Sequence, residues 1–488
     1  MININIEPCT VFSGIFILRT RPSEKKQAMK KGQELTLEVT DIAFGGRGLA
    51  KPDGFAVFVD GALAGDTVSA RIFKKKKSYA EARAVEILAP SADRVQPPCP
   101  YSGTCGGCKW QFVDYSAQCA FKRRHVAEAL SHIGQIHDVP VAETIPSERI
   151  FGYRNKMEFT CSDRRWLLSE ELGKEDVQRD FAVGLHVPGT FDKVLDTRVC
   201  LLMPELGNRL LEEVRGFIRN SGVPVYGLRS HQGYWRFVML RHSVFFDQWM
   251  VNIVTSEDRP ELLQPLAEAM RSRYPAVVSV VNNITARKAG IAVGEKERLL
   301  SGAPVIEERV GGLIFEVSAN SFFQTNTRGA ETLYNVAADF AGLTGTEQLL
   351  DLYCGTGTIA MWLSKAAARV TGIEMVESAV ADAERNCRRN GIDNCRFIRG
   401  DIRDVLTGFR ERPEVIIIDP PRVGMHKDVV EQLLTLLPER IVYVSCNPAT
   451  LARDLGLLAE AYRIVEVQPV DLFPHTFHIE AVAKLQRL

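Results

Sequence analysis

The sequence predicts a multidomain fold with a small N-terminal β-barrel, a mixed α+β middle domain and a C-terminal doubly wound α/β domain. The chain has 488 residues, which is more than one ordinary domain holds. Glycine-broken β-type segments fill residues 35–87, and beyond Val310 apolar strands alternate with helices, as in a mainly parallel sheet. We therefore expect an N-terminal extension (1–31), the barrel (32–91), the middle domain (92–308) and the α/β domain (309–488).

The overall charge gives no reason to expect a nucleic-acid partner, because 60 Lys and Arg residues balance 60 Asp and Glu residues. Local charge does. The segment from Arg19 to Lys31 carries six basic residues and one acid, and Lys74 to Lys77 is an unbroken basic run. Either run alone could simply be a solvated surface.

We expect a cytoplasmic protein without a membrane partner. The apolar stretch from Val11 to Leu18 has no basic leader or cleavage site, and no segment approaches the roughly 20 apolar residues that cross a bilayer. Eleven cysteines in such a chain favour metal ligation, catalysis or inert burial over a disulfide framework.

The N-terminal elements are short and punctuated by turns at Gly45, Gly46 and Gly65. A barrel of this size that carries a lysine run is typical of oligonucleotide-binding (OB-like) modules. The segment "VTDIAFGGRGLAKPDGFAVFVDGALAGDTVSARI" also resembles the TRAM domain of RNA-modifying enzymes. The expected strands are Leu35–Val39, Ala56–Val59, Thr67–Phe73 and Ala82–Ile87, followed by a linker at Ser91–Pro98.

In the middle domain the clearest elements are a helix at Ala117–Ile133 and strands at Trp235–Leu240 and Trp249–Thr255. The α/β domain is more regular. Its expected strands are Gln348–Tyr353, Val370–Glu374, Cys395–Ile398, Val415–Ile418, Ile441–Ser445 and Ile479–Leu485, with helices from Thr358, at Ser378–Asn390 and at Ala449–Ala461.

A cofactor site is predicted where the first of these strands meets its helix. Gly355 and Gly357 allow a ligand to approach the backbone, and Glu374 ends the next strand, where a carboxylate can accept ribose hydroxyls. With Ala360 the spacing also meets the dinucleotide fingerprint, so it leaves NAD open. The segment "DLYCGTGT" resembles the first motif of class I methyltransferases, which bind S-adenosylmethionine. That resemblance places Tyr353 and Thr358 along the cofactor, Glu374 at its ribose, Asp401 near the adenine and Asp419 near the methionine end.

Two tetrapeptides fall at strand ends of the same sheet, "DPPR" (Asp419 to Arg422) and "SCNP" (Ser445 to Pro448). Amino-group methylases have an aromatic residue where this chain has Arg422. A cysteine at the neighbouring strand suits a reaction at carbon, because C5 of uracil becomes nucleophilic only after a thiolate adds to C6. A base must then remove the C5 proton, and Glu480 in "FPHTFHIEAV" is the candidate.

Together, "FFQTN", "DLYCGTGT", "DPPR", "SCNPATLARDL" and "FPHTFHIE" resemble the RNA uracil-5-methyltransferases over residues 322–488. The resemblance implies that Cys446 is the nucleophile, Glu480 the proton acceptor and Gln324 a cofactor ligand. Asn326 and Arg422 are weaker candidates for contacts with the RNA, and His475 and His478 are expected to be structural. Read singly, Cys446 could be an inert buried residue and Glu480 a carboxylate at a sheet edge or in a salt bridge.

Cys99, Cys105 and Cys108 form a C-x5-C-x2-C pattern among glycines, which lets a loop fold around a metal. Spacing leaves the fourth ligand open among Cys119, Cys161 and Cys200, and four thiolates bind zinc as well as an iron–sulfur cluster. The resemblance to the 23S ribosomal RNA uracil-5-methyltransferases implies a [4Fe–4S] cluster with Cys200 as the fourth ligand. The spacing does not match the C-x3-C-x2-C pattern of radical enzymes.

The predicted activity is therefore methylation of a uridine at C5, with 23S rRNA as the favoured target and no DNA partner. Some relatives with both a TRAM domain and a four-cysteine cluster modify tRNA, so tRNA stays open. The alternatives from other classes are a non-catalytic RNA-binding protein held together by its metal and an NAD-linked redox enzyme.

Overall fold

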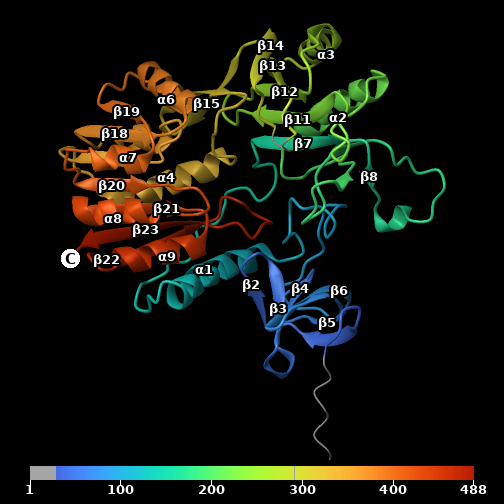
Figure 1. The fold of residues 1–488 in the computed structure, drawn as a ribbon, viewed down its shortest axis with the longest axis horizontal. Coiled ribbons are helices and arrows are strands. Elements are labelled where there is room, and N and C mark those ends of the chain that lie inside the picture. The colour runs from blue at the N-terminus through green and yellow to red at the C-terminus, as the bar shows by residue number, and fades with distance from the viewer. Residues whose placement is uncertain (1–28, 289, 291) are drawn as a thin grey trace, which may run out of the picture.

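The computed structural model describes residues 29–288, 290 and 292–488. The expected extension therefore lies almost wholly outside the described residues, and so does most of its basic run. Figure 1 shows the barrel in blue, the middle-domain sheet in green and the α/β domain in gold to red. Among the described residues, no helix is both long enough and apolar enough to span a bilayer.

The N-terminal module is a six-stranded sheet in the order β1-β5-β6-β4-β3-β2. Its inward-facing side chains alternate with outward ones, for example along β5, where Val68, Ala70 and Ile72 are buried. Strands β1 and β2 are parts of one bent segment, because the N–H groups of Val39 and Thr40 between them donate to the carbonyls of Asp66 and Leu49 (both 2.9 Å). Residues 34–43 therefore pair with β5 at one end and with β3 at the other, which closes the barrel that we expected. The strands are β1 (Glu34–Glu38), β2 (Asp41–Ala43), β3 (Arg47–Ala50), β4 (Ala56–Asp60), β5 (Thr67–Lys75) and β6 (Tyr79–Ala89).

The segment expected to be a linker is tied to this module. Asp66, which is fully buried, accepts hydrogen bonds from the Ser91 backbone (2.8 Å) and forms an ion pair with Arg94. The Arg94 guanidinium also lies over the Phe112 ring, 4.6 Å from its centroid. Residues 91–94 therefore join the two bodies as an ordered connection and not as a free tether.

The middle domain contains a six-stranded sheet in the order β14-β13-β12-β11-β7-β9. Helices α2 and α3 pack with these strands around one apolar core, which includes Leu211 and Leu266. A two-stranded ribbon, β8 with β10, lies beside it. The elements are β7 (Lys156–Ser162), β8 (Arg165–Trp166), β9 (Ala182–Gly184), β10 (Val194–Leu195), α2 (Glu205–Asn220), β11 (Trp235–His242), β12 (Trp249–Thr255), α3 (Pro260–Arg273), β13 (Val277–Ile284) and β14 (Lys296–Gly302).

Helix α1 (Tyr115–His132), the helix expected in the middle domain, packs elsewhere. Its Val126 and Leu130 belong to the apolar core of the α/β domain, where the helix contacts α9 (Pro448–Leu458). In Figure 1, α1 lies under the α/β domain, next to α9. A helix that is close to the barrel in sequence thus forms part of the support of the C-terminal sheet.

The α/β domain has a seven-stranded sheet in the order β19-β18-β17-β20-β21-β23-β22. The first five strands of this order are parallel, and β23 runs antiparallel to both of its neighbours. The doubly wound fold is confirmed, whereas β22, α4 (Thr327–Ala341), α7 (Ile402–Thr407), α8 (Lys427–Leu436) and the hairpin of β15 (Val305–Val310) with β16 (Leu313–Ser318) were not predicted. The strands are β17 (Gln348–Leu352), β18 (Arg369–Glu374), β19 (Cys395–Arg399), β20 (Val415–Ile418), β21 (Arg440–Ser445), β22 (Tyr462–Val470) and β23 (Glu480–Arg487).

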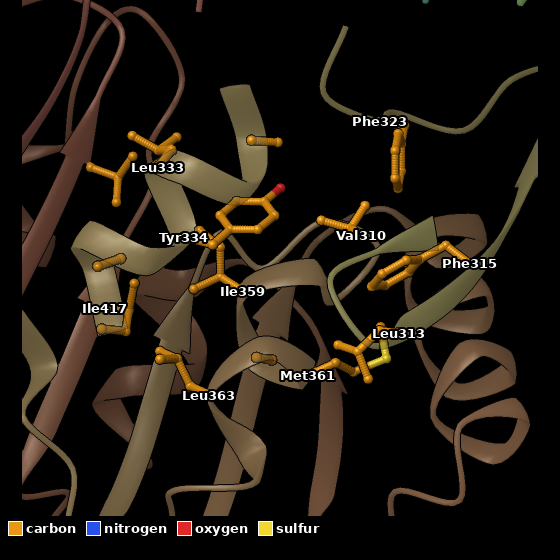
Figure 2. Close-up of a cluster of buried hydrophobic side chains, with 14 of the residues drawn as sticks. Val310, Leu313, Phe315, Phe323, Leu333, Tyr334, Ile359, Met361, Leu363 and Ile417 are labelled. Atoms are coloured by element: carbon orange, nitrogen blue, oxygen red, sulfur yellow. The ribbon is translucent and has the colours of Figure 1, made fainter. Parts of the chain in front are cut away.

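Two apolar cores cover the two faces of this sheet. One is formed with α4, α5, α6 and the hairpin β15–β16, and Figure 2 shows its centre, where Tyr334, Ile359 and Phe315 converge. The other is formed with α1, α7, α8 and α9. The remaining elements are β15 (Val305–Val310), β16 (Leu313–Ser318), α4 (Thr327–Ala341), α5 (Thr358–Ser364), α6 (Glu377–Arg389), α7 (Ile402–Thr407) and α8 (Lys427–Leu436).

Candidate active site

A cavity of about 740 Å³ opens at the carboxyl ends of the parallel strands of the α/β domain. Sheets of this type place their ligands at that edge, because loops that leave neighbouring strands meet there. Most of the predicted cofactor residues and both predicted catalytic residues line the cavity. They are Gln324, Tyr353, Thr358, Glu374, Asp419, Cys446 and Glu480, together with Arg422.

Sheet register brings Cys446 and Glu480 together from distant parts of the sequence. Ser445, the last residue of β21, pairs with Ala481 of β23, so the next step of this antiparallel pair places Cys446 beside Glu480. Opposite residues of such a pair have Cα atoms roughly 5 Å apart. Asp419 follows β20, which pairs with β21 on its other side, and it reaches the same cavity.

Burial controls the protonation of this group. It raises the pKa of Asp419 to about 7 and the pKa of Glu480 well above its usual range, where the Asp419 charge adds to the effect. Burial and the two carboxylates also raise the pKa of the Cys446 thiol to about 11, although Arg422 opposes them. Burial in this cavity therefore favours the uncharged forms of the Cys446 thiol and the Glu480 carboxyl.

The turn from β17 into α5 has the geometry that the glycines predicted. Gly355 has a φ of +54°, and a Cβ built there would meet no atom within 4 Å, so the cavity reaches its backbone. Gly357 has a φ of +76°, and a Cβ there would lie 2.8 Å from the Phe397 ring. The Gly355 N–H donates to Glu374 Oε2 (3.1 Å), which fixes that carboxylate beside the turn.

Asp351 is a site residue that we did not predict. Its carboxylate is fully buried and lines the cavity, and among the described residues no side chain pairs with it and only the Ala360 backbone lowers its pKa. Burial, with the charges of Asp419 and Glu374, raises its pKa well above the usual range. A buried acid without a side-chain partner is costly unless a ligand supplies a cation. The signal was available in "EQLLDLY", where one acid interrupts an apolar strand.

Asp401 lies outside this cavity. It lines an adjoining cavity of about 780 Å³, which shares Tyr353 and Glu374 with the first. Its side chain accepts from the Arg403 backbone at the start of α7 and forms an ion pair with the Arg403 guanidinium (2.6 Å). This pairing lowers the pKa of Asp401 to about 2. The carboxylate thus has structural partners of its own.

Asn326, one of the weaker candidates, caps a helix. Its Oδ1 accepts from the Gly329 N–H at the start of α4, and its Nδ2 donates to the Leu472 carbonyl. It is buried and does not line the cavity. The expectation that it contacts RNA is therefore not supported by its position. His478, which we expected to be structural, does line the cavity.

A second cavity, of about 280 Å³, gathers the predicted metal ligands. Cys99, Cys105, Cys108 and Cys200 all line it, whereas Cys119 and Cys161 do not. Burial raises the pKa of Cys105 to about 11 and of Cys108 to about 12, and the neighbouring cysteines add to both shifts. Among the described residues, no three His, Cys, Asp or Glu side chains converge closely enough to hold a metal ion as they stand.

Comparison with known proteins places this geometry in a family. The tRNA (uracil-5-)-methyltransferase family model matches residues 267–488, and the TRAM domain model matches residues 28–85. An uncharacterized RNA methyltransferase of Chlorobaculum tepidum is 44% identical, over 96% of this chain and 100% of its own length. Another, of Porphyromonas gingivalis, is 43% identical over 92% of this chain and 99% of its own length.

A solved structure agrees over the same length. The tRNA (uracil-54, C5)-methyltransferase of Pyrococcus abyssi, in complex with S-adenosyl-L-homocysteine, superposes with a TM-score of 0.73 and 29% identity. The match covers 92% of this chain and 100% of that one. With this likeness and relatives above 40% identity across nearly the whole chain, the protein belongs to the RNA uracil-5-methyltransferases, S-adenosylmethionine-dependent enzymes that here carry an N-terminal TRAM domain.

Proposed function

We propose that the protein methylates C5 of a uridine in 23S rRNA through a covalent bond between Cys446 and C6 of the base. The observation that carries the mechanism is the pairing of β21 with β23, which sets a thiol beside a buried carboxyl in a cavity large enough for a nucleotide and a cofactor. The gathering of four cysteines in one cavity, next to a TRAM domain, supports the rRNA target.

The chemistry follows from these neighbours. The Cys446 thiolate adds to C6 and makes C5 nucleophilic, C5 takes the methyl group, and the Glu480 carboxylate then removes the C5 proton as the C6–S bond breaks. Both groups must be ionised to act. The positive charge of the cofactor's sulfonium favours the ionised forms, because an opposite charge in a dry site lowers the pKa of an acid.

For the cofactor, we propose that the Asp351 carboxylate holds its ammonium group and that Glu374 accepts its ribose hydroxyls. The burial of the Asp351 carboxylate without a side-chain partner among the described residues and the open backbone at Gly355 support this arrangement. Gln324, Thr358 and Tyr353 form the surrounding wall, Asp419 lies near the methionine end, and Asp401 borders the adenine from the adjoining cavity.

Binding of S-adenosylmethionine is expected to tighten as the pH rises through about 7, where Asp419 titrates. A bound sulfonium favours the carboxylate, so the pKa of Asp419 falls on binding and a proton is released below that range. Calorimetry in buffers of different ionisation enthalpy measures the release. S-adenosylhomocysteine, which lacks the positive sulfur, is the matched ligand and should show a weaker dependence, as should Asp419→Asn. Equal pH dependence for both ligands would remove the sulfonium from this role.

We also propose that Cys99, Cys105, Cys108 and Cys200 hold a [4Fe–4S] cluster, with zinc as the alternative. Their shared cavity supports this, and small shifts of the sulfurs would be needed to ligate. The purified protein is then expected to be brown and to contain iron. Cys200→Ser should lose the iron, while Cys119→Ser, which changes a cysteine outside the cavity, should keep it. A colourless protein with one zinc after anaerobic purification would favour the alternative.

The target RNA can be identified directly. Mass mapping of ribosomal RNA and tRNA from a strain that lacks the gene should show loss of 5-methyluridine from 23S rRNA, restored by the gene but not by its Cys446→Ala variant. Loss from tRNA alone would favour the second candidate, which the similarity to the Pyrococcus abyssi tRNA enzyme supports.

A further inference from the structure

The loop Asp471–Ile479, which joins β22 to β23 and leads directly into Glu480, is held mainly by parts of the chain outside its own sheet. The first anchor is a buried ion pair. Lys122 of α1 donates to Asp471 Oδ1 (2.6 Å) and to the Phe473 carbonyl (3.1 Å), and both charged side chains are fully buried. One lysine thus fixes the start of the loop at two points.

Gln118, one turn earlier on α1, holds the centre of the loop. Its Oε1 accepts from the His475 N–H (2.7 Å), and its Nε2 lies 3.2 Å from His475 Nδ1 while also donating to the Trp110 and Val113 carbonyls. Burial lowers the pKa of His475 to about 4, so its ring is neutral and Nδ1 can accept. Through Gln118, helix α1 therefore contacts both the backbone and the ring of His475.

The cysteine cavity supplies the third anchor. The Lys109 and Trp110 N–H groups, which follow Cys108, donate to the His475 carbonyl (3.1 and 3.0 Å). Tyr153 donates to the Pro474 carbonyl (3.1 Å). Thr476 and His478 from the loop line the cysteine cavity, and His478 also lines the catalytic cavity. The loop is thus the shared wall between the four cysteines and Glu480.

His475 also has a left-handed backbone, with a φ of 65°. A residue other than glycine keeps that conformation only where its surroundings over-determine it, and such residues concentrate at functional sites. A loop that merely closed a hairpin would not require three anchors from three other segments, which are α1, residues 109–110 and Tyr153. The anchors hold Asp471, Phe473, Pro474 and His475, and from His475 the backbone leads through residues 476–479 to Glu480.

We propose that Gln118 and Lys122 are positioning residues that aim the Glu480 carboxylate at the C5 proton, so that loosening the clamp slows elimination more than addition or methyl transfer. The proposal rests on the proposed function, because it concerns the step assigned to Glu480. It gives the cysteine site a role in catalysis, since the segment after Cys108 is part of the same clamp.

The test compares two RNAs that differ at one atom. RNA with 5-fluorouridine should form the Cys446 adduct without elimination, whereas uridine RNA should pass through it. In Gln118→Met, the fluorinated adduct should form within about twofold of the wild-type rate, while turnover on uridine falls by roughly tenfold or more and a methylated adduct with ordinary uridine accumulates on denaturing gels. A variant that was merely unstable would lose both reactions together.

Asn282→Leu is the matched control, because Asn282 is also a fully buried amide whose Nδ2 donates to several acceptors, in the middle-domain sheet. It should trap no uridine adduct. The double variant Lys122→Met with Asp471→Leu removes the ion pair without leaving an unpaired buried charge. It should reproduce the trapping. It therefore tests the clamp even if Gln118→Met does not fold.

The outcomes distinguish failure of the covalent mechanism from failure of the positioning role. If the wild-type enzyme forms no adduct with fluorinated RNA, the covalent mechanism fails. If it does, and both clamp variants lose turnover without accumulating the uridine adduct, only the positioning role is overturned. Cys200→Ser, which changes the cysteine cavity beside this clamp, is expected to give the same partial trapping, and its absence would remove the cysteine site from the clamp.

Discussion

Replacement of Cys446 by alanine is expected to reduce methyl transfer to uridine RNA by at least roughly 10⁴-fold, because the reaction can then no longer proceed through the covalent C6 adduct. Without addition at C6 there is no enolate to attack the methyl group. Transfer of labelled methyl from S-adenosylmethionine to RNA, measured in a single turnover, checks this. Binding of the cofactor should change little, since Cys446 lies beyond its expected position.

Cys354→Ala is the control for this prediction. Cys354 lines the same cavity and is buried, but its environment is that of a packed side chain beneath Gly372. It should retain turnover and the fluorinated adduct, both of which Cys446→Ala should lose. Methylation of uridine by Cys446→Ala at a rate close to that of the wild type would mean that the reaction does not use a covalent cysteine.

Much of the α/β domain was predictable because its strands are continuous apolar runs that are buried on both faces. The expected strand Val415–Ile418 is β20 without a change in its bounds, and β17, β18 and β21 differ from expectation by one residue. The glycine turn and its carboxylate also followed from sequence, since Gly355 and Gly357 have the positive φ that only glycine adopts freely.

The failures share a cause, which is contact between segments far apart in sequence. Helix α1 was expected within the middle domain, yet its apolar face meets α9, more than 300 residues later. The ion pair of Asp401 with Arg403 at the start of α7 was not predicted either, and the place of Asp401 near the adenine stays a prediction. Residues 91–94 looked like a linker, yet Asp66 binds them. The boundaries at residues 91 and 308 stay predictions.

Sequence spacing identifies three of the four proposed metal ligands, and the fourth depends on the fold. Cys99, Cys105 and Cys108 are recognisable as a group from their spacing, but the fourth ligand could be chosen only by resemblance. Folding brings Cys200 to the same cavity and leaves Cys119 on α1 and Cys161 inside β7. Asp351 was missed for another reason. Its importance depends on the absence of a side-chain partner for its carboxylate among the described residues.

Glu480→Gln is expected to convert the enzyme into one that stalls after methyl transfer. The amide keeps the shape of the side chain but cannot accept the C5 proton, so the Cys446 adduct with methylated, ordinary uridine should accumulate and turnover should fall by roughly 10²–10⁴-fold. Glu480 is buried, and the sheet register places it beside Cys446. Denaturing electrophoresis and mass spectrometry of the cross-linked peptide detect the product.

Asp419→Asn distinguishes this assignment from its nearest rival. Asp419 lines the same cavity and titrates near neutral pH, so it is the other acid that could take the proton. If Glu480 is the acceptor, Asp419→Asn should weaken cofactor binding without trapping the uridine adduct. Trapping by Asp419→Asn together with wild-type turnover by Glu480→Gln would transfer the role to Asp419. Trapping by neither variant would leave water as the acceptor, with the elimination step no longer dependent on a buried carboxylate.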